Sequence, residues 1–174
     1  MKLLLSGTLL VCLLPFISMG NLNRQSGNKA DTTERKSMSD LINLYYDLKD
    51  ALVNSDASAA AEKARLLLDA VSNADIKSLS ANDAKEFTAI QPKLAYDARH
   101  ISEVKAIDHQ REHFASLSAN MFKLAKVVKL SATPVYKMYC PMKKAYWLSN
   151  ETTVRNPYYG QQMLSCGKVE ETIK

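Results

Sequence analysis

The chain has 174 residues, and 47% of them are aliphatic, aromatic or sulfur-containing, which suits one folded domain and argues against wholesale disorder. The 23 Lys and Arg residues exceed the 18 Asp and Glu residues by only five. These charges are interspersed and form no basic stripe, so the sequence disfavours a nucleic-acid-binding function.

The first twenty residues have the pattern of a secretory signal peptide. Lys2 gives a positive start, residues 3–19 are mostly apolar, and Ser18 and Gly20 are small residues that fit a signal peptidase site. An uncleaved anchor is the alternative, but a run of about 17 residues is marginal for a membrane span. We expect cleavage near Gly20, a periplasmic or secreted product, and no integral membrane segment in the mature chain.

Residues 21–38 are polar and are predicted to form a flexible tether. In residues 39–130, apolar side chains recur at helical spacing in four stretches. The first begins near Ser39 or Asp40 and the second after Asp56, which are residue types that cap helices. The third opens near Ser80 and contains Pro92, which predicts a kink or an interruption. The fourth carries Ile107, Phe114, Leu117, Met121, Leu124 and Val128.

Glycine is absent between Asn28 and Tyr159, which favours uninterrupted helices over sheet. Four amphipathic helices with short links predict an all-α fold, an antiparallel four-helix bundle over residues 39–130. Residues 131–174 contain prolines, glycines and most of the tyrosines. We expect them to form an irregular C-terminal segment of short strands or turns, packed on the bundle as part of the same domain.

The C-terminal segment is a candidate metal-binding tail. It contains Cys140, Met142, Met163 and Cys166, and thiolate and thioether sulfur select soft ions such as monovalent copper or silver. Cleavage of the signal peptide would leave Cys140 and Cys166 as the two cysteines of the mature chain. The alternative is a structural disulfide, which would stabilise the fold by about 3–4 kcal/mol. In that case the methionines and Trp147 would form a small satellite core.

The three histidines are weaker metal-ligand candidates. His109 and His113 are four residues apart, so they share one face of a helix and could chelate a metal. If the chain turns near Val104, His100 and His113 face each other across adjacent helices. Each histidine taken singly is more simply a solvated or hydrogen-bonded residue than a ligand.

Enzymatic chemistry has little support in the sequence. A glycine-rich phosphate loop, a Gly-x-Ser-x-Gly elbow, a His-Glu-x-x-His motif and a Cys-x-x-Cys motif are all absent. Cys140 with a histidine could in principle pair a nucleophile with a base, but nothing indicates an oxyanion hole. We therefore predict that the protein is not an enzyme.

The tail motifs resemble those of a bacterial family of exported helical domains of unknown function. They are Cys-Pro-Met (140–142), Ala-Tyr-Trp-Leu-Ser (145–149), Arg-Asn-Pro-Tyr-Tyr-Gly (155–160) and Met-Leu-Ser-Cys-Gly (163–167). Leu-Lys-Asp-Ala-Leu (48–52) and Gln-Arg-Glu-His-Phe (110–114) are similar to the helical part of the same family. The resemblance covers residues 39–174. One departure is the short Lys-Lys link at 143–144, where the family has a longer, glycine-containing loop.

Similar domains also occur joined to periplasmic adaptor subunits of heavy-metal efflux pumps, so the resemblance implies copper or silver handling. It implies a site formed by Cys140, Met142, Met163 and Cys166, with His100 and His113 as helical contributors. The hypothesis is an exported protein that binds monovalent copper, with silver or zinc as alternatives. It would buffer the metal or deliver it to a component of an efflux system. The rival hypothesis is a helical interaction module held by a Cys140–Cys166 disulfide.

The charge of the tail bears on this site. Lys143, Lys144 and Arg155 lie close to the sulfur residues in the sequence. Cations near a thiol favour its thiolate form. The sequence therefore predicts lowered pKa values for the two cysteines.

Overall fold

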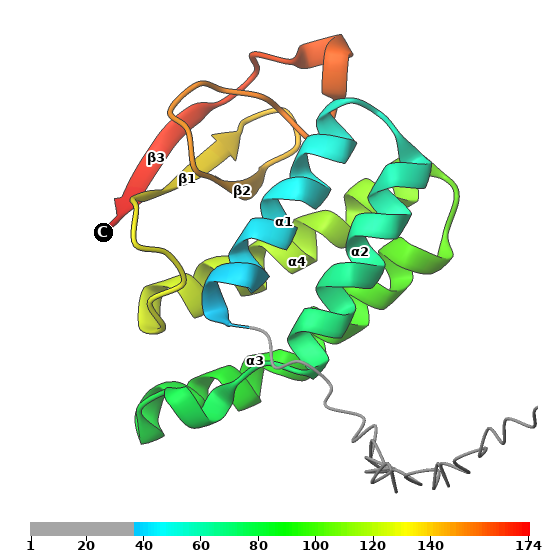
Figure 1. Cartoon of the computed structure of the whole chain (residues 1–174). Helices are drawn as coiled ribbons and strands as arrows, with labels where there is room; N and C mark the ends of the chain where they lie inside the picture. Colours follow the sequence, from blue (N-terminus) through cyan, green and yellow to red (C-terminus); the bar gives the residue numbers. More distant parts are fainter. Residues whose placement is uncertain (1–36) are drawn as a thin grey trace, which may run out of the picture. The chain divides into compact units, whose positions relative to one another are not determined.

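The computed structural model describes residues 37–174, which belong to one compact unit (Figure 1). The predicted signal peptide and nearly all of the predicted tether lie outside these residues. Four helices come first: α1 (Met38–Val53), α2 (Ala57–Ser72), α3 (Ala81–Glu103) and α4 (Ile107–Val127), with a short 3-10 helix, η1 (Ile76–Ser78), between α2 and α3. Three strands and a second 3-10 helix follow: β1 (Val135–Cys140), β2 (Ala145–Ser149), η2 (Gly160–Met163) and β3 (Lys168–Ile173).

Helix α1 begins one residue earlier than predicted because its cap lies further upstream. Ser37 and Asp40 form a reciprocal capping box, in which each side chain accepts from the backbone N–H of the other. Neither Ser39 nor Asp40 is the cap residue itself. The box satisfies two backbone donors at the start of the helix, so Met38 is already helical.

The predicted starts of α2 and α3 are confirmed. The Asp56 carboxylate accepts from the backbone N–H of Ala59, and the Ser80 hydroxyl accepts from that of Asp83. Of the two outcomes predicted for Pro92, a kink or an interruption, the interruption is wrong, because α3 runs as one helix through this residue. Helix propagation on both sides therefore outweighs the one hydrogen bond that proline removes.

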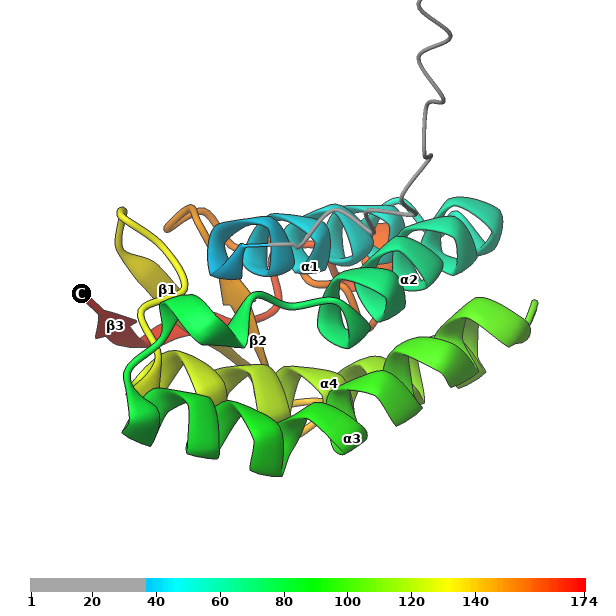
Figure 2. The same cartoon turned by 60° about the horizontal axis from the view of Figure 1, so that its bottom comes forward.

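The four helices pack against one another as predicted. Figure 2 shows α1 and α2 in one layer and α3 and α4 in a second. The layers meet through fully buried side chains, including Leu41, Leu48, Phe114 and Leu117, and the rings of Tyr45 and Phe114 stack at 5.3 Å. None of the described helices combines the length and the apolar character needed to cross a lipid bilayer.

The prediction of a purely α-helical fold is wrong, because the C-terminal segment forms a three-stranded antiparallel sheet. The strand order is β2-β1-β3, with Tyr139 opposite Tyr146 and Cys140 opposite Ala145 (Figure 1). Strand β1 is rich in the β-branched and aromatic residues that favour strands. The turn after it, residues 141–144, closes with Lys144 at φ 56° and a backbone hydrogen bond from Lys144 to Cys140.

One tyrosine joins the sheet to the helices. The hydroxyl of Tyr45, on α1, lies 2.7 Å from the Ser118 hydroxyl and accepts from the backbone N–H of Leu148, on β2, at 3.0 Å. Complete burial raises the pKa of Tyr45 well above its ordinary value. Bundle and sheet therefore share one core, since Trp147 and Leu148 are buried in the same cluster as the helix residues.

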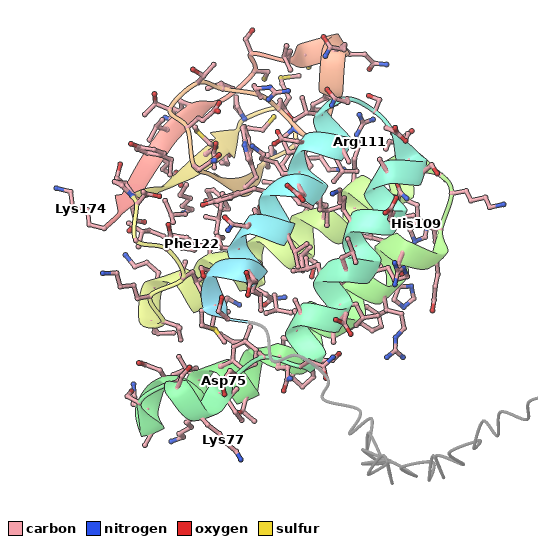
Figure 3. The ribbon with its side chains drawn as sticks, in the orientation of Figure 1. Asp75, Lys77, His109, Arg111, Phe122 and Lys174 are labelled. Atoms are coloured by element: carbon pink, nitrogen blue, oxygen red, sulfur yellow. The ribbon has the colours of Figure 1, made fainter. Side chains whose placement is uncertain are left out.

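Lys137, on the central strand β1, connects the sheet to α4. The Lys137 ammonium lies 4.2 Å from the centre of the Phe122 ring and 3.8 Å from that of Tyr146, and it pairs with Glu170 at 2.9 Å (Phe122 is labelled in Figure 3). A cation between two aromatic faces is stabilised by the ring quadrupoles. This contact fixes the sheet on the helix that also carries two of the histidines.

Candidate functional site: a dithiol at the end of the sheet

The structure brings Cys140 and Cys166 together. Cys140 ends β1 and is fully buried, whereas Cys166 follows η2 and is half-buried. Their sulfur atoms are 3.9 Å apart, and both thiols are free. This pair is the centre of the candidate site.

The turn between β1 and β2 points backbone N–H groups at both sulfurs. The N–H of Lys143 lies 3.4 Å from the Cys140 sulfur, and the N–H of Met142 bonds to the Cys166 sulfur. Hydrogen bonds to an ionised acceptor are about twice as strong as those between neutral groups. These two N–H donors would therefore favour the thiolate form of each cysteine over its thiol form.

Asn156 completes the dithiol from the other side. It is fully buried, and its Nδ2 donates to the Cys140 sulfur at 3.2 Å and to the Cys166 carbonyl at 2.7 Å. Its Oδ1 accepts from the backbone N–H of Tyr158 at 2.8 Å. Our sequence reasoning missed this residue, although it lies in the Arg-Asn-Pro-Tyr-Tyr-Gly motif and Asn before Pro is a turn signal.

Gly167 lets the chain pass close to the indole beneath the site. It has φ +154°, and a Cβ there would lie 2.7 Å from Cη2 of Trp147 and 3.1 Å from the Tyr139 carbonyl oxygen. Only glycine fits this conformation and this approach. The position of Cys166, one residue earlier, therefore depends on Gly167 and on a buried tryptophan.

The two predicted methionine ligands, Met142 and Met163, flank Cys166. Met142 donates its N–H to the thiol, and the Met163 carbonyl accepts from the Cys166 N–H at 3.0 Å. Both side chains are exposed, Met142 at 60% and Met163 at 39%, whereas Met38, Met121 and Met138 are buried. Exposed methionines beside an accessible thiol do not serve the core, so the satellite-core interpretation does not account for them.

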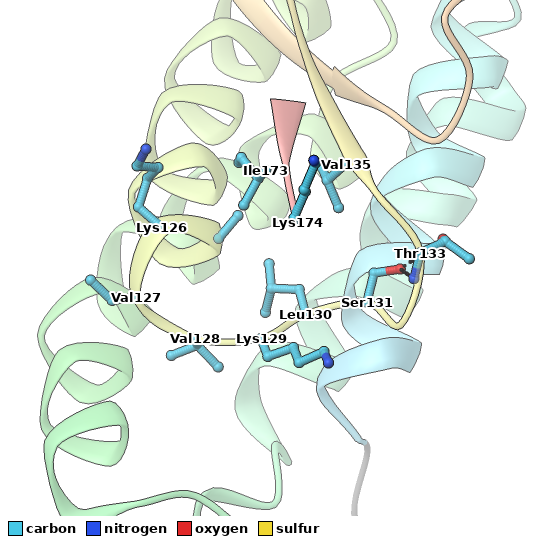
Figure 4. A pocket seen from close by; sticks show the side chains of 11 residues that line it. Lys126, Val127, Val128, Lys129, Leu130, Ser131, Thr133, Val135, Ile173 and Lys174 are labelled. Carbon is cyan, nitrogen blue, oxygen red and sulfur yellow. Dashed lines mark hydrogen bonds between the residues drawn. The ribbon is translucent and has the colours of Figure 1, made fainter. Parts of the chain in front are cut away.

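One pocket beside the sheet lies at the end opposite to the dithiol. It has a volume of about 260 Å³ and is lined by Lys126, Lys174 and Val135 among others (Figure 4). Val135 and Cys140 are the two ends of β1, so this pocket and the dithiol are separated by the length of a strand. Lys126 is paired with Glu171, and the pocket brings no metal-binding side chain to the site.

The predicted lowering of the thiol pKa is wrong for Cys166. Loss of solvent contact raises the pKa of this thiol, and the neighbouring Cys140 raises it further. Arg155 lies 3.5 Å from the carboxylate of Asp50, which already engages its charge. The two turn lysines are exposed, where water screens their effect.

Cys166 should therefore alkylate slowly at neutral pH. Because only the thiolate reacts, we expect the rate for reduced, metal-free protein to rise through a midpoint above about 8.5, the value of a free cysteine. Iodoacetamide labelling followed by mass spectrometry between pH 6 and 10 measures this midpoint, with a Cys166→Ser variant as the background. A midpoint below that of a free cysteine would contradict the raised pKa.

The histidines form a second cluster between α3 and α4. The predicted meeting of His100 and His113 across these helices is confirmed, with their rings stacked at 4.7 Å. His113 also contacts Asp97 and His109. In the described residues no hydrogen bond joins a cysteine to a histidine, and no group of three or more His, Cys, Asp or Glu side chains is placed to hold a metal ion.

Fold and site together define a small domain in which four helices carry a C-terminal three-stranded sheet with two neighbouring free thiols, one buried and one half-buried. The chain belongs to the family described as "Protein of unknown function (DUF3347)", whose model matches residues 41–133, just over half of the chain. The match covers the helices and ends before β1. Neither a curated protein nor a solved structure gives a significant match.

Proposed function

We propose that the protein binds one soft monovalent ion, copper or silver, through Cys140 and Cys166. The observation that carries this proposal is the pair of free sulfurs 3.9 Å apart, each facing an N–H donor from the same turn. Metal–sulfur bonds of about 2.3 Å place two sulfurs about 3.8 Å apart at a tetrahedral ion and about 4.0 Å apart at a trigonal one. The spacing therefore suits a shared ion with little rearrangement.

A third donor is available at the exposed side of the pair. Met142 and Met163 flank Cys166 through their backbones, and their thioethers are solvent-accessible. Two thiolates and one thioether form a low-coordinate, all-sulfur set that favours monovalent copper over harder ions. A Cys2His2 zinc site would need imidazoles beside the thiols, and the described histidines gather elsewhere.

The charge around the site supports an ion held as a dithiolate complex. Lys143 and Lys144 are exposed on the turn that borders both sulfurs, and Asn156 donates from the buried side. A dithiolate with one monovalent cation keeps one net negative charge, which the hydrogen bond from buried Asn156 would stabilise more than the water-screened lysines. Calcium or magnesium would need several carboxylates, which this turn does not supply.

The cellular role that we propose is metal buffering, or delivery to an efflux system, in an exported compartment. Its support is the signal-peptide pattern of residues 1–20 and the likeness of the tail to domains joined to efflux adaptor subunits. An accessible site with an exposed thioether rim suits transfer of an ion between proteins better than long-term burial does.

A competition titration tests the metal function. Fully reduced protein should withdraw one equivalent of monovalent copper from a chromogenic chelator, whereas protein with a Cys140–Cys166 disulfide should withdraw almost none. The double variant Met142→Leu/Met163→Leu should bind about tenfold or more weakly, as loss of a supporting group does at metal sites. Met38→Leu is the matched control, because this buried methionine on α1 keeps the rim intact.

Each result bears on the proposal. A reduced wild-type protein that leaves the chelator complex unchanged would overturn the metal function. Equal affinities in the wild type and the double methionine variant would show that the two thioethers are not ligands, and the dithiol alone would remain as the proposed site.

The second candidate function is a metal-free interaction module with a structural disulfide. The nearness of the two thiols favours it, because exchange with an external disulfide would need only a small movement of Cys166. Thiol counting on protein isolated from its native compartment separates the two functions. Two titratable thiols with bound copper would exclude the module, and no titratable thiols would support it.

A further inference from the structure

Two imidazole nitrogens on α4 converge at the surface of the histidine cluster. Nε2 of His109 and Nε2 of His113 lie 3.2 Å apart, and their rings are inclined by 24°. His109 is exposed, and it lies on α4 apart from Arg111, which enters the core (Figure 3). The pair is therefore open to ions from solvent on a helix that is otherwise well packed.

A buried carboxylate orients one of these rings. Asp97, on α3, is 3% exposed, and its Oδ1 lies 3.2 Å from Nδ1 of His113. In the neutral form of His113, a carboxylate acceptor at Nδ1 favours the tautomer with the proton on Nδ1, which leaves the lone pair on Nε2. Metal-binding histidines are characteristically held this way, with the second nitrogen donating to a carboxylate.

The spacing fits one shared ion. Metal–nitrogen bonds of about 2.0–2.1 Å at a tetrahedral angle place two nitrogens about 3.3 Å apart. Without an ion the same distance suits an N–H to N hydrogen bond between the rings. Replacement of that single proton by a cation would leave both rings nearly in place.

His100 lies next to the pair without converging on it. Its ring is stacked on that of His113, with an angle of 14° between the planes. The centre of the His100 ring also lies 4.3 Å from the centre of the Tyr96 ring. Among the described residues, no hydrogen bond joins a ring nitrogen of His100 to His113, whereas Nε2 of His109 lies 3.2 Å from Nε2 of His113. The stack therefore braces His113 and makes His100 a natural control for the site.

We propose that His109 and His113 form a second metal site, for a divalent ion of the late first row such as Cu²⁺. Imidazole suits such ions, and Cu²⁺ binds most strongly among them. Water would fill the remaining positions on the exposed side. The site is independent of the dithiol, and its chemistry is different: neutral nitrogen donors for a divalent ion in place of thiolates for a monovalent one.

The test uses untagged Cys166→Ser protein that begins at Asn21, so it lacks the dithiol and retains the buried Cys140 as its one cysteine. Cu²⁺ is titrated into this protein, with binding followed by calorimetry and the ligands identified by nitrogen hyperfine structure in electron paramagnetic resonance. We expect one ion with two imidazole ligands. His109→Asn and His113→Asn should each weaken binding at least tenfold, whereas His100→Asn should change it less than about threefold.

Thermal melts without metal show whether each variant is folded. His109 is exposed, so His109→Asn should melt like its parent, and its loss of Cu²⁺ affinity would then report the site alone. Unchanged affinity in His109→Asn, or an equal loss in His100→Asn, would overturn the proposal. Since the dithiol is absent from every protein in this series, the outcome leaves the monovalent-copper function untouched.

Discussion

Replacement of Gly160 by alanine should cost about 2–5 kcal/mol of unfolding free energy, a large part of the 5–15 kcal/mol typical of a domain. Gly160 has φ +56°, where a side chain costs about 1–2 kcal/mol. A Cβ there would lie 2.5 Å from the Ser55 hydroxyl and 2.9 Å from Nη2 of Arg111. Overpacking of this kind costs a further 1–3 kcal/mol or so.

The clash would strike the contact that holds the tail on the bundle. Arg111 is 7% exposed, and its guanidinium donates to the carbonyls of Pro157 and Leu52 and to the Ser55 hydroxyl. One side chain of α4 thus ties the 155–160 loop to the end of α1. A displaced guanidinium would leave buried carbonyls without a donor, which adds to the loss.

Urea unfolding followed by the fluorescence of Trp147, the single tryptophan, measures the effect. Gln161→Ala is the matched control, because this neighbour is exposed and its change should fall within about 0.5 kcal/mol of the wild type. A loss below about 1 kcal/mol for Gly160→Ala, with an unchanged denaturant slope, would contradict the role assigned to this glycine.

The helices were predictable because their signals are local. Asp56 and Ser80 are cap residues at the right distance from apolar stripes, and the residues of those stripes, such as Phe114 and Leu117, are buried as expected. The predicted first residue of α1 differs from the observed one because Ser37, Ser39 and Asp40 are all residue types that cap helices. The reciprocal bonds between Ser37 and Asp40 decide among them. Periodicity locates a helix better than it locates the first residue.

The sheet was harder to predict because its strands are short and because three of the six residues of β3 are charged. Strand β3 reads Lys-Val-Glu-Glu-Thr-Ile, which by itself favours no element strongly. It forms a strand because it pairs with the edge of β1 and because Lys137, on β1, forms an ion pair with Glu170, on β3. Such pairing between segments about thirty residues apart is a tertiary property, invisible to local pattern.

The sequence identified the sulfur residues of the site but not what supports them. The chemistry of Cys140 and Cys166 follows from their identity, whereas their 3.9 Å approach depends on Asn156 and Gly167. Residue type likewise drew attention to His100 and His113. The four-residue spacing already placed His109 and His113 on one helix face. The structure adds that their Nε2 atoms lie 3.2 Å apart, whereas His100 is stacked on His113.

Loss of either thiol should have the largest effect on copper binding. We expect Cys140→Ser and Cys166→Ser each to weaken the affinity for monovalent copper by at least about 100-fold, since even outer supporting groups at metal sites cost about 10–100-fold. A serine oxygen is a hard donor that monovalent copper disfavours. A single remaining thiolate with one thioether leaves the ion poorly coordinated.

The two variants should differ sharply in metal-free stability. Cys140 is fully buried and accepts from Asn156 and Lys143, so a smaller, more polar serine there should cost about 1–3 kcal/mol. Cys166 is half-buried at the rim, and its replacement should leave the unfolding free energy nearly unchanged. Equal losses of affinity with unequal losses of stability would show that the sulfur atoms themselves bind the ion.

The measurement is the same chelator competition under reducing conditions, with urea unfolding of each metal-free protein in parallel. Ser165→Ala is the matched control, because it changes an exposed neighbour of Cys166 and keeps both thiols. If either cysteine variant bound monovalent copper within about threefold of the wild-type affinity, the replaced thiol would not be a ligand and the proposed site would be wrong. If instead both variants lose stability only under oxidising conditions, and the wild type takes up no copper when reduced, the two cysteines serve as a disulfide and the interaction module is the better account.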